Sequence, residues 1–244
     1  EDYASVLLKL VQTLGKPRTM AILNENTDFG TSGAKAAKVI AGQKGIQIVA
    51  EEAYSAGSPD YRSTLAKIKG TNPDLVFMVS YVADGILLMR QARELGLKPQ
   101  AFLGAGAGFA QMDFAKERAI SNLVFSSTQW TPDVNWPGAK EFAKRYRERF
   151  GKQEVPYHAA NAYASLMVMG EAAARSGGNR EALRQTLERG EWEGILGKVK
   201  FLDYAGYTHQ NRHTMLVEQI QNGKHETVFP ANLAVKQPIF PHKW

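Results

Sequence analysis

The chain has 244 residues, 44% of them apolar, with a net charge of +6 and no cysteine. This apolar content supports a folded core and excludes an intrinsically disordered chain. The lack of cysteine excludes disulfides, thiolate metal sites and a cysteine nucleophile. The densest basic stretch, 140–150, interleaves its cations with Glu141 and Glu148, which favours a solvated helix face over a nucleic-acid surface. No apolar run approaches the ~18 residues of a membrane-spanning helix.

The first half of the chain alternates short apolar runs with helical patterns. Helices are predicted at 2–15, 31–45, 58–70, 83–96 and 109–119, and strands at 18–25, 46–54, 74–81, 100–106 and 122–128. This alternation predicts an α/β fold in which a parallel sheet is covered by helices on both faces. Ligands of such sheets bind beyond the carboxyl ends of the strands, so the turns at 24–30, 80–84 and 104–109 are the places to search for a site.

After Thr128 the alternation stops. Residues 129–138 contain tryptophan and proline and predict a connector, and three further helices are predicted at 139–151, 159–178 and 179–190. Near the end, Asn222-Gly223 predicts a hairpin turn between two alternating strands. The helix at 159–178 is apolar on much of its surface, so we expect it to pack against a sheet, and this region of the sequence offers no strands for one.

The stretch FLGAGAGFAQ, at 102–111, raises the question of a phosphate-binding loop. The dinucleotide fingerprint needs G-x-G-x-x-G after the first strand and an acid at the end of the next strand. Here Phe109 occupies the third glycine position, the loop follows a late strand, and the next strand ends in Ser126, Ser127 and Thr128. We therefore expect a tight strand-to-helix turn whose glycines let the backbone approach whatever lies above it.

The sequence also lacks a catalytic pattern. The segment GTSGA fails the serine-elbow pattern, because Ala34 stands where glycine is required. The five histidines have no spacing typical of a metal site. The sequence thus predicts a protein that is not an enzyme, with no catalytic residues, no metal site and no cofactor.

The turns at the predicted sheet edge carry aromatic and neutral polar residues instead. Phe29 follows the first strand, Tyr81 the third and Phe109 the fourth. Binding sites for small molecules combine apolar walls with a few hydrogen-bonding groups, and helix N-termini attract carboxylates. The pattern favours a small-molecule site, although ordinary packing explains any one of these aromatic residues equally well.

Stretches spread over nearly the whole chain carry a family resemblance. They are NENTDFGTSGAKAAK, the run from Ser58 to Leu97, FLGAGAG, PGAKEFAKRYRERFG, ANAYASLMV, LGKVKF and VFPANLAVKQPIF. They resemble the extracytoplasmic solute-binding proteins of ABC transporters, specifically the branched-chain amino-acid-binding (leucine/isoleucine/valine-type) family with the type I periplasmic binding fold.

The resemblance implies two α/β lobes with parallel sheets flanked by helices, joined by three crossings. On this basis residues 1–127 are expected to form lobe 2, and residues 128–201 the helical remainder of lobe 1. Residues 202–244 are expected to form a crossover and a hairpin that returns to the hinge and lobe 2. The chain then starts at the first crossing and lacks the N-terminal sheet of lobe 1.

The resemblance also implies a set of ligand-binding residues. The family uses an aromatic residue after the first strand of lobe 2, usually tyrosine, and a tyrosine after the third, which correspond to Phe29 and Tyr81. Amino-acid-binding members often place an acid in the glycine-rich turn, but here that turn holds Ala105 and Gly106. Because an unpaired buried ammonium is costly, an amino-acid ligand needs another acid, for which Asp84 is the candidate.

Two more residues are expected to contribute from the other lobe, namely Tyr157 and Asn161. The implied function is the solute-binding component of an ABC transporter, in which hinge closure traps a small hydrophobic amino acid. One alternative is a ligand without an ammonium group, such as an aromatic or aliphatic carboxylate, and another is a ligand-sensing regulator of the amide-responsive type. The expected partners are a small-molecule ligand and a membrane permease, with no nucleic acid and no membrane insertion. The expected location is the periplasm, or a lipid-anchored extracytoplasmic position, after removal of a signal peptide.

Overall fold

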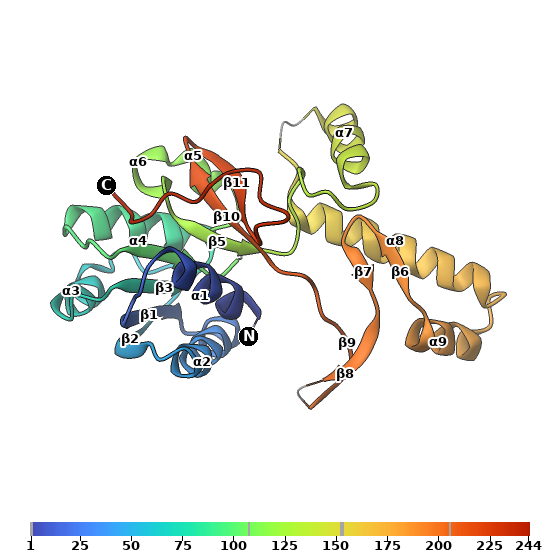
Figure 1. Cartoon of the computed structure of the whole chain (residues 1–244), viewed down its shortest axis with the longest axis horizontal. Helices are drawn as coiled ribbons and strands as arrows, with labels where there is room; N and C mark the ends of the chain where they lie inside the picture. The colour runs from blue at the N-terminus through green and yellow to red at the C-terminus, as the bar shows by residue number, and fades with distance from the viewer. Residues whose placement is uncertain (1, 107, 152–153, 205) are drawn as a thin grey trace. The chain divides into compact units, whose positions relative to one another are not determined.

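The computed structural model describes residues 2–106, 108–151, 154–204 and 206–244. Their contacts divide the chain into two compact units. The first unit comprises Glu1–Thr128 and Met215–Trp244, and the second comprises Gln129–Thr214 (Figure 1). Two segments far apart in the sequence thus build the first unit together.

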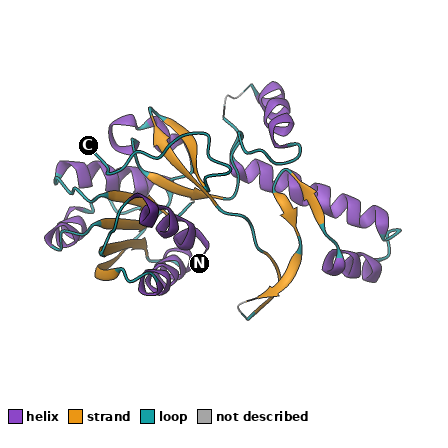
Figure 2. Cartoon of the chain, in the orientation of Figure 1, coloured by secondary structure: helices purple, strands orange, loops and turns teal. Residues whose placement is uncertain are grey.

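Within the described residues, the first unit contains a seven-stranded sheet (Figure 2). In spatial order its strands are β11 (Lys224–Phe229), β10 (Leu216–Gln221), β5 (Phe125–Thr128), β4 (Ala101–Gly104), β3 (Leu75–Val79), β1 (Thr19–Glu25) and β2 (Gln47–Tyr54). Strands β1 to β5 run parallel, whereas β10 pairs antiparallel with both β5 and β11. The predicted α/β fold class is confirmed.

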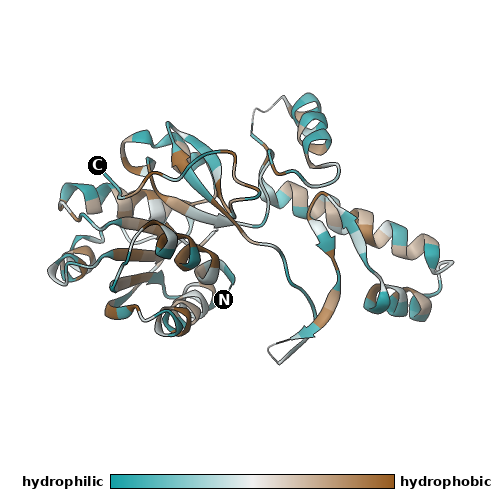
Figure 3. Cartoon of the chain, in the orientation of Figure 1, coloured by the Kyte–Doolittle hydropathy of each residue, from teal (hydrophilic) through white to brown (hydrophobic). Residues whose placement is uncertain are grey.

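Helices cover both faces of this sheet. They are α1 (Asp2–Leu14), α2 (Asp28–Gln43), α3 (Arg62–Gly70), α4 (Val82–Glu94), α5 (Met112–Lys116) and α6 (Arg118–Ser121). Side chains in β3 alternate between the two faces, so Phe77 joins the core beneath α1 and α2, while Met78 joins the core beneath α3 and α4. Every residue of β3 is buried, which explains its unbroken apolar run. Figure 3 shows β3 in brown, whereas the β10–β11 hairpin carries much teal.

Three helices of the first unit start several residues away from the start that the sequence predicts. Helix α2 begins at Asp28 rather than at residue 31. Helix α3 begins at Arg62 rather than at residue 58. The reason is local: the Asp60 carboxylate accepts a hydrogen bond from the Arg62 N–H, and the Tyr61 N–H donates to the side chain of Gln91, so the chain enters the helix only after these contacts. The helix predicted at 109–119 starts later, because Phe109 belongs to the preceding turn. It is split into α5 and α6 at Glu117, whose backbone angles (φ −75°, ψ 55°) are not helical.

The hairpin predicted at Asn222-Gly223 is confirmed. Its two central residues have φ values of +56° and +78°, a backbone conformation that asparagine and glycine adopt more easily than other residues. The turn connects β10 to β11 and thereby adds the C-terminal segment to the edge of the sheet next to β5.

The second unit is mainly helical. Its elements are α7 (Ala139–Phe150), α8 (Tyr157–Arg175), α9 (Arg180–Arg189), β6 (Trp192–Gly194), β7 (Gly197–Val199), β8 (Phe201–Tyr204) and β9 (Tyr207–Asn211). The four strands form two separate antiparallel pairs, β6–β7 and β8–β9, and in the described part of this unit no parallel strand pair is found.

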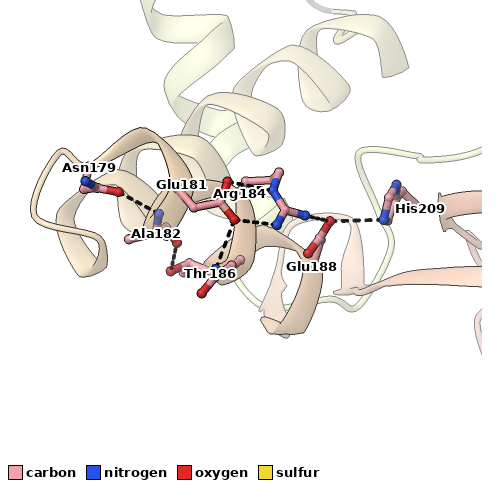
Figure 4. Close-up of polar contacts among 8 residues, drawn as sticks. Asn179, Glu181, Ala182, Arg184, Thr186, Glu188 and His209 are labelled. Atoms are coloured by element: carbon pink, nitrogen blue, oxygen red, sulfur yellow. Dashed lines mark hydrogen bonds and ion pairs between the residues drawn. The ribbon is translucent and has the colours of Figure 1, made fainter.

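Polar contacts hold the end of this unit together. The Asn179 side chain accepts a hydrogen bond from the Ala182 N–H at the start of α9, as an N-cap residue does (Figure 4). On the same helix, Arg184 pairs with Glu181 and Glu188, and its hydrogen bond lowers the pKa of Glu181 to about 2 (Figure 4).

Helix α8 leaves much of its apolar surface open. Leu166, Met167 and Met169 are 72%, 55% and 44% exposed. Only Ala160, Ala164 and Ala172 of this helix are buried. The sheet that the sequence analysis expects beneath this helix is therefore not among the described residues.

Candidate functional site

The carboxyl ends of β1 and β3 bring two of the predicted site residues together. The strands are neighbours in the sheet and run parallel, so the turns that follow them lie side by side. Phe29 is the second residue of α2, just after the first turn, and Tyr81 precedes α4. Their ring centroids are 5.5 Å apart with an angle of 34° between the planes, and Tyr81 is 47% exposed. The pair forms a partly open aromatic surface at this edge of the sheet.

Close packing explains the glycines of the neighbouring turn after β4. A Cβ atom on Gly104 would lie 2.2 Å from Cγ of Phe109, and one on Gly108 would lie 2.5 Å from the backbone of Tyr81. Gly106 has a φ of +57°, which disfavours other residues. Ala107 lies outside the described residues. The turn is thus packed directly against the backbone that carries Tyr81.

Among the described residues of this turn that follow β4, every backbone N–H group already has an acceptor within the chain. The N–H groups of Ala105, Gly106, Gly108 and Phe109 all donate to carbonyl groups of the chain. The acceptors are, in that order, the carbonyls of Met78, Gly104, Ser80 and Gly106, at 2.9, 3.0, 3.2 and 3.0 Å. A phosphate-binding loop needs such N–H groups to point at its ligand. The expectation of a tight turn rather than a nucleotide loop agrees with this geometry.

Among the other predicted residues of the turn, Ala105 faces the interior. Its side chain is buried and belongs to the core beneath α1 and α2. Gly106 is the residue of the turn that lies nearest to α1, because a Cβ atom placed there would be 3.1 Å from the Tyr3 ring. Tyr3 was not predicted as a site residue, because 103 positions separate it from Gly106 and no local pattern connects them.

Asp84 lies in the first turn of α4 and is bonded within the protein. It is 6% exposed, and its Oδ1 accepts hydrogen bonds from the Gly57 N–H at 2.9 Å and from the Tyr61 hydroxyl at 2.7 Å. Burial, together with the hydrogen bond to Asp84, raises the pKa of Tyr61 above its ordinary value. Asp84 therefore anchors the loop between β2 and α3. Its Oδ1 atom already accepts these two hydrogen bonds and is not available to pair with the ammonium group of a ligand.

The remaining predicted residues belong to the second unit. Tyr157 is the first residue of α8, where its ring lies 3.9 Å from the ring of His158. Asn161, one turn later, donates from Nδ2 to Oε1 of Gln129 at 2.6 Å. The role of both residues in ligand binding stays a prediction.

Two hollows of the described surface lie in the second unit, and none of the predicted site residues lines either of them. One, of about 680 Å³, is lined by α7 and α8 and includes Phe142, Tyr146 and Tyr163. The other, of about 210 Å³, lies between α8 and the β6–β7 pair. The larger hollow is lined by charged side chains of α7, namely Glu141, Arg145, Glu148 and Arg149. We place the candidate site at the aromatic edge of the first unit, because it lies at the carboxyl ends of a parallel sheet, where ligands of such folds bind.

The described residues give no support for metal chemistry or membrane insertion. Among them, no three His, Asp or Glu side chains gather as metal ligands would. In the same part of the chain, no helix is both long and apolar enough to cross a bilayer.

Known proteins similar to this chain share its fold. The Leu/Ile/Val-binding protein homolog 7 of Brucella melitensis is 26% identical over 98% of this chain and 64% of its own length. The binding protein LivJ of Streptococcus pneumoniae, solved with isoleucine, has a TM-score of 0.74 at 24% identity, covering 94% of this chain and 66% of LivJ. A solute-binding protein of Rhodopseudomonas palustris, solved with 3,4-dihydroxybenzoic acid, has a TM-score of 0.77 at 21% identity, covering 97% and 66%.

These comparisons agree with the resemblance read from the sequence. The chain spans about 64% of the length of the first of these relatives. A model of the periplasmic binding protein family matches residues 1–225. With most of the chain matched in this way, the protein belongs to the periplasmic binding protein family.

Proposed function

We propose that the chain is part of the extracytoplasmic solute-binding component of an ABC transporter, with a membrane permease as its partner, and that it binds a ligand and catalyses no reaction. The aromatic pair Phe29–Tyr81, at the carboxyl edge of a parallel sheet, is the observation that carries the proposal. Family membership and the name of the Brucella relative support a transport role. We further propose that the first unit corresponds to lobe 2 and the second unit to the helical remainder of lobe 1.

The ligand class depends on whether a carboxylate is available for an ammonium group. The glycine-rich turn carries no acid, and the buried acid Asp84 already accepts two hydrogen bonds. Glu25, at the end of β1, is also fully buried and hydrogen-bonded. An ammonium group left without a partner at this edge costs several kcal/mol. These contacts favour a small aromatic or aliphatic carboxylate over a hydrophobic amino acid.

Each ligand class has a precedent among similar structures. The Rhodopseudomonas protein holds an aromatic acid, and the Streptococcus protein holds an amino acid. An aromatic acid suits the described edge better, because its ring can stack on Tyr81 and it brings no ammonium group.

A thermal-shift panel followed by titration calorimetry tests the proposal. The panel contains leucine, isoleucine, valine and phenylalanine on one side, and benzoate and 3,4-dihydroxybenzoate on the other. A ligand at ~100 times its dissociation constant adds about 2.7 kcal/mol to the free energy of unfolding. We expect stabilisation by the acids without an amine. Stabilisation by the amino acids alone would reverse the choice of ligand class. If no compound stabilises the protein, both proposed ligand classes are wrong.

A transport assay tests the partner. Uptake of the stabilising compound by cells that express the protein is compared with uptake by cells that lack it. Equal uptake in both would contradict the proposed transport role.

A further inference from the structure

Glu25 is a buried acid at the binding edge that the sequence analysis did not single out. It ends β1, and its side chain is fully buried. Its Oε2 accepts a hydrogen bond from the Thr27 N–H at 2.6 Å. Its Oε1 accepts from the Thr27 hydroxyl at 2.7 Å and from the Gly30 N–H at 2.6 Å. The Glu25 carboxylate thus lies over the turn and accepts hydrogen bonds from residues before and after Phe29 in the sequence.

Gly30 makes this arrangement possible. A Cβ atom at this position would lie 2.0 Å from the Glu25 carbonyl oxygen and 2.7 Å from its Oε1. A larger residue would push the carboxylate away from the turn. The backbone around Phe29 is therefore held by Glu25 on one side, while the ring of Phe29 packs beside Tyr81 at 5.5 Å.

The position of the carboxylate also has an electrostatic consequence. The N-terminus of a helix attracts anions, because its first N–H groups lack partners within the helix. At α2 the Glu25 carboxylate takes the Thr27 and Gly30 N–H groups, and Thr27 itself provides no side-chain cap. Asp28, in the first turn of the same helix, adds another negative charge there. An anionic ligand group at this helix end would be repelled by both carboxylates.

We propose that Glu25 is the positioning residue of the binding edge: it fixes Phe29 beside Tyr81 and occupies the place that an anionic ligand group would otherwise take at the N-terminus of α2. For the ligand, this inference rests on the proposed function. It means that the ligand turns its apolar body toward Phe29 and that its carboxylate binds elsewhere. The positioning of Phe29 itself holds whatever the ligand is.

Fluorine NMR of the protein labelled with fluorophenylalanine tests the positioning without any ligand. The variant Phe29→Leu identifies the Phe29 resonance among the 11 phenylalanines. We expect Glu25→Ala and Glu25→Gln to shift or broaden this resonance. The matched control is Asn179→Ala, which removes a helix cap in the second unit (Figure 4) and should leave the Phe29 signal unchanged. An unchanged Phe29 signal in a folded Glu25 variant would overturn the positioning role.

Formate serves as an anionic probe of the position at the N-terminus of α2 that the Glu25 carboxylate leaves empty in Glu25→Ala. In Glu25→Ala, added sodium formate should return the Phe29 resonance toward its wild-type position, because the small carboxylate can accept the freed N–H groups. The wild-type protein and Asn179→Ala should not respond to it. If Glu25→Ala responds no more than the wild type does, the anion-site half of the proposal is wrong.

Binding of benzoate and benzamide provides the readout for charge selectivity. If Phe29 is no longer held in place, the affinity for both compounds falls. If the buried negative charge of Glu25 is removed, the affinity for the anionic benzoate rises relative to that for the neutral benzamide. The ratio of benzoate to benzamide affinity should therefore rise at least threefold in Glu25→Gln and stay constant in Asn179→Ala. An unchanged ratio would contradict the electrostatic role. If the wild-type protein binds neither these compounds nor the amino acids, the proposed function fails, and the two NMR experiments still decide the role of Glu25.

Discussion

Asp84 joins two parts of the first unit through a single carboxylate oxygen. The Tyr61 hydroxyl and the Gly57 N–H both donate to Oδ1, so this side chain ties α4 to the loop before α3. Asparagine at this position retains Oδ1 as an acceptor and loses only the charge. The variants Asp84→Asn and Asp84→Ala therefore separate the structural role of this residue from a role in binding an ammonium group.

We expect Asp84→Ala to lower the free energy of unfolding by about 1–3 kcal/mol, because the buried Tyr61 hydroxyl and the partly buried Gly57 N–H lose their acceptor. Asp84→Asn should cost less than ~1 kcal/mol and should leave the dissociation constant of an aromatic acid unchanged. Urea unfolding and titration calorimetry measure the two quantities. A tenfold or larger loss of amino-acid affinity in Asp84→Asn would restore this residue as the charge partner.

The buried His242 side chain should make the free energy of unfolding depend on pH. Burial lowers its pKa to about 4, and its ring packs against Phe102 and Trp244 at centroid distances of 5.0 and 4.8 Å. An unfolded histidine has a pKa near ~6.5, so the unfolded state takes up the proton first as the pH falls. The contribution of His242 is therefore complete above pH ~6.5 and decreases by about 3 kcal/mol down to pH 4.

Urea unfolding at pH 7, 5.5 and 4 checks this dependence. In His242→Gln the loss of stability on acidification should be smaller by about 3 kcal/mol than in the wild type. The comparison variant is His209→Gln, whose side chain is exposed and contacts Glu188 at 3.2 Å. Because an exposed ion pair contributes less than about 1 kcal/mol, this variant should stay close to the wild-type curve. Parallel curves for the wild type and His242→Gln would show that His242 does not carry the effect.

At the level of elements, the glycine-rich turn is held by packing. Gly104→Ala places a Cβ atom 2.2 Å from the Phe109 ring, whereas a Cβ atom on Gly170, within α8, meets no atom within 4 Å. We expect Gly104→Ala to destabilise the protein by about 1–3 kcal/mol and to move Tyr81, since the turn packs on its backbone. Gly170→Ala should stabilise α8 by up to about 1 kcal/mol, because alanine has the higher helix propensity.

Thermal unfolding of both glycine variants measures this contrast. The two substitutions add the same methyl group, so a common effect of the added carbon cancels in the comparison. If both variants changed the unfolding temperature equally, close packing around Gly104 would not be what holds the turn.

The elements that the sequence predicts best are those with a local cause. The apolar run of β3, the glycine spacing of the turn and the Asn222-Gly223 hairpin each follow from a few adjacent residues. The start of α3 was missed, because Gln91, 30 positions away, takes the Tyr61 N–H. The same holds at the candidate site. The strand pattern predicts that Phe29 and Tyr81 follow two strands of one sheet, whereas the contacts of Asp84 and the approach of Tyr3 to Gly106 depend on tertiary packing.

For the whole molecule, the two units differ in how much apolar surface they bury. The first unit has a core on each face of its sheet. In the second unit α8 buries only three alanines, and no residue of α9 is buried. Resistance to local opening depends on buried apolar contacts, so the units should differ in stability within one chain.

Hydrogen exchange of the 244-residue chain, followed by mass spectrometry, measures this difference directly. Amides of β1 and β3 should exchange only through the largest opening of the protein, because both strands are almost entirely buried and paired on both edges. Amides of α9 should exchange at least tenfold faster, since no residue of this helix is fully buried and its ion pairs are exposed and contribute little. Helix α2 provides the internal control, because it is also a surface helix but buries Ala34, Ala37 and Ile40 against the sheet. If α9 exchanged as slowly as α2, burial within its own unit would not be what determines its stability, and contacts beyond those described here would have to hold it.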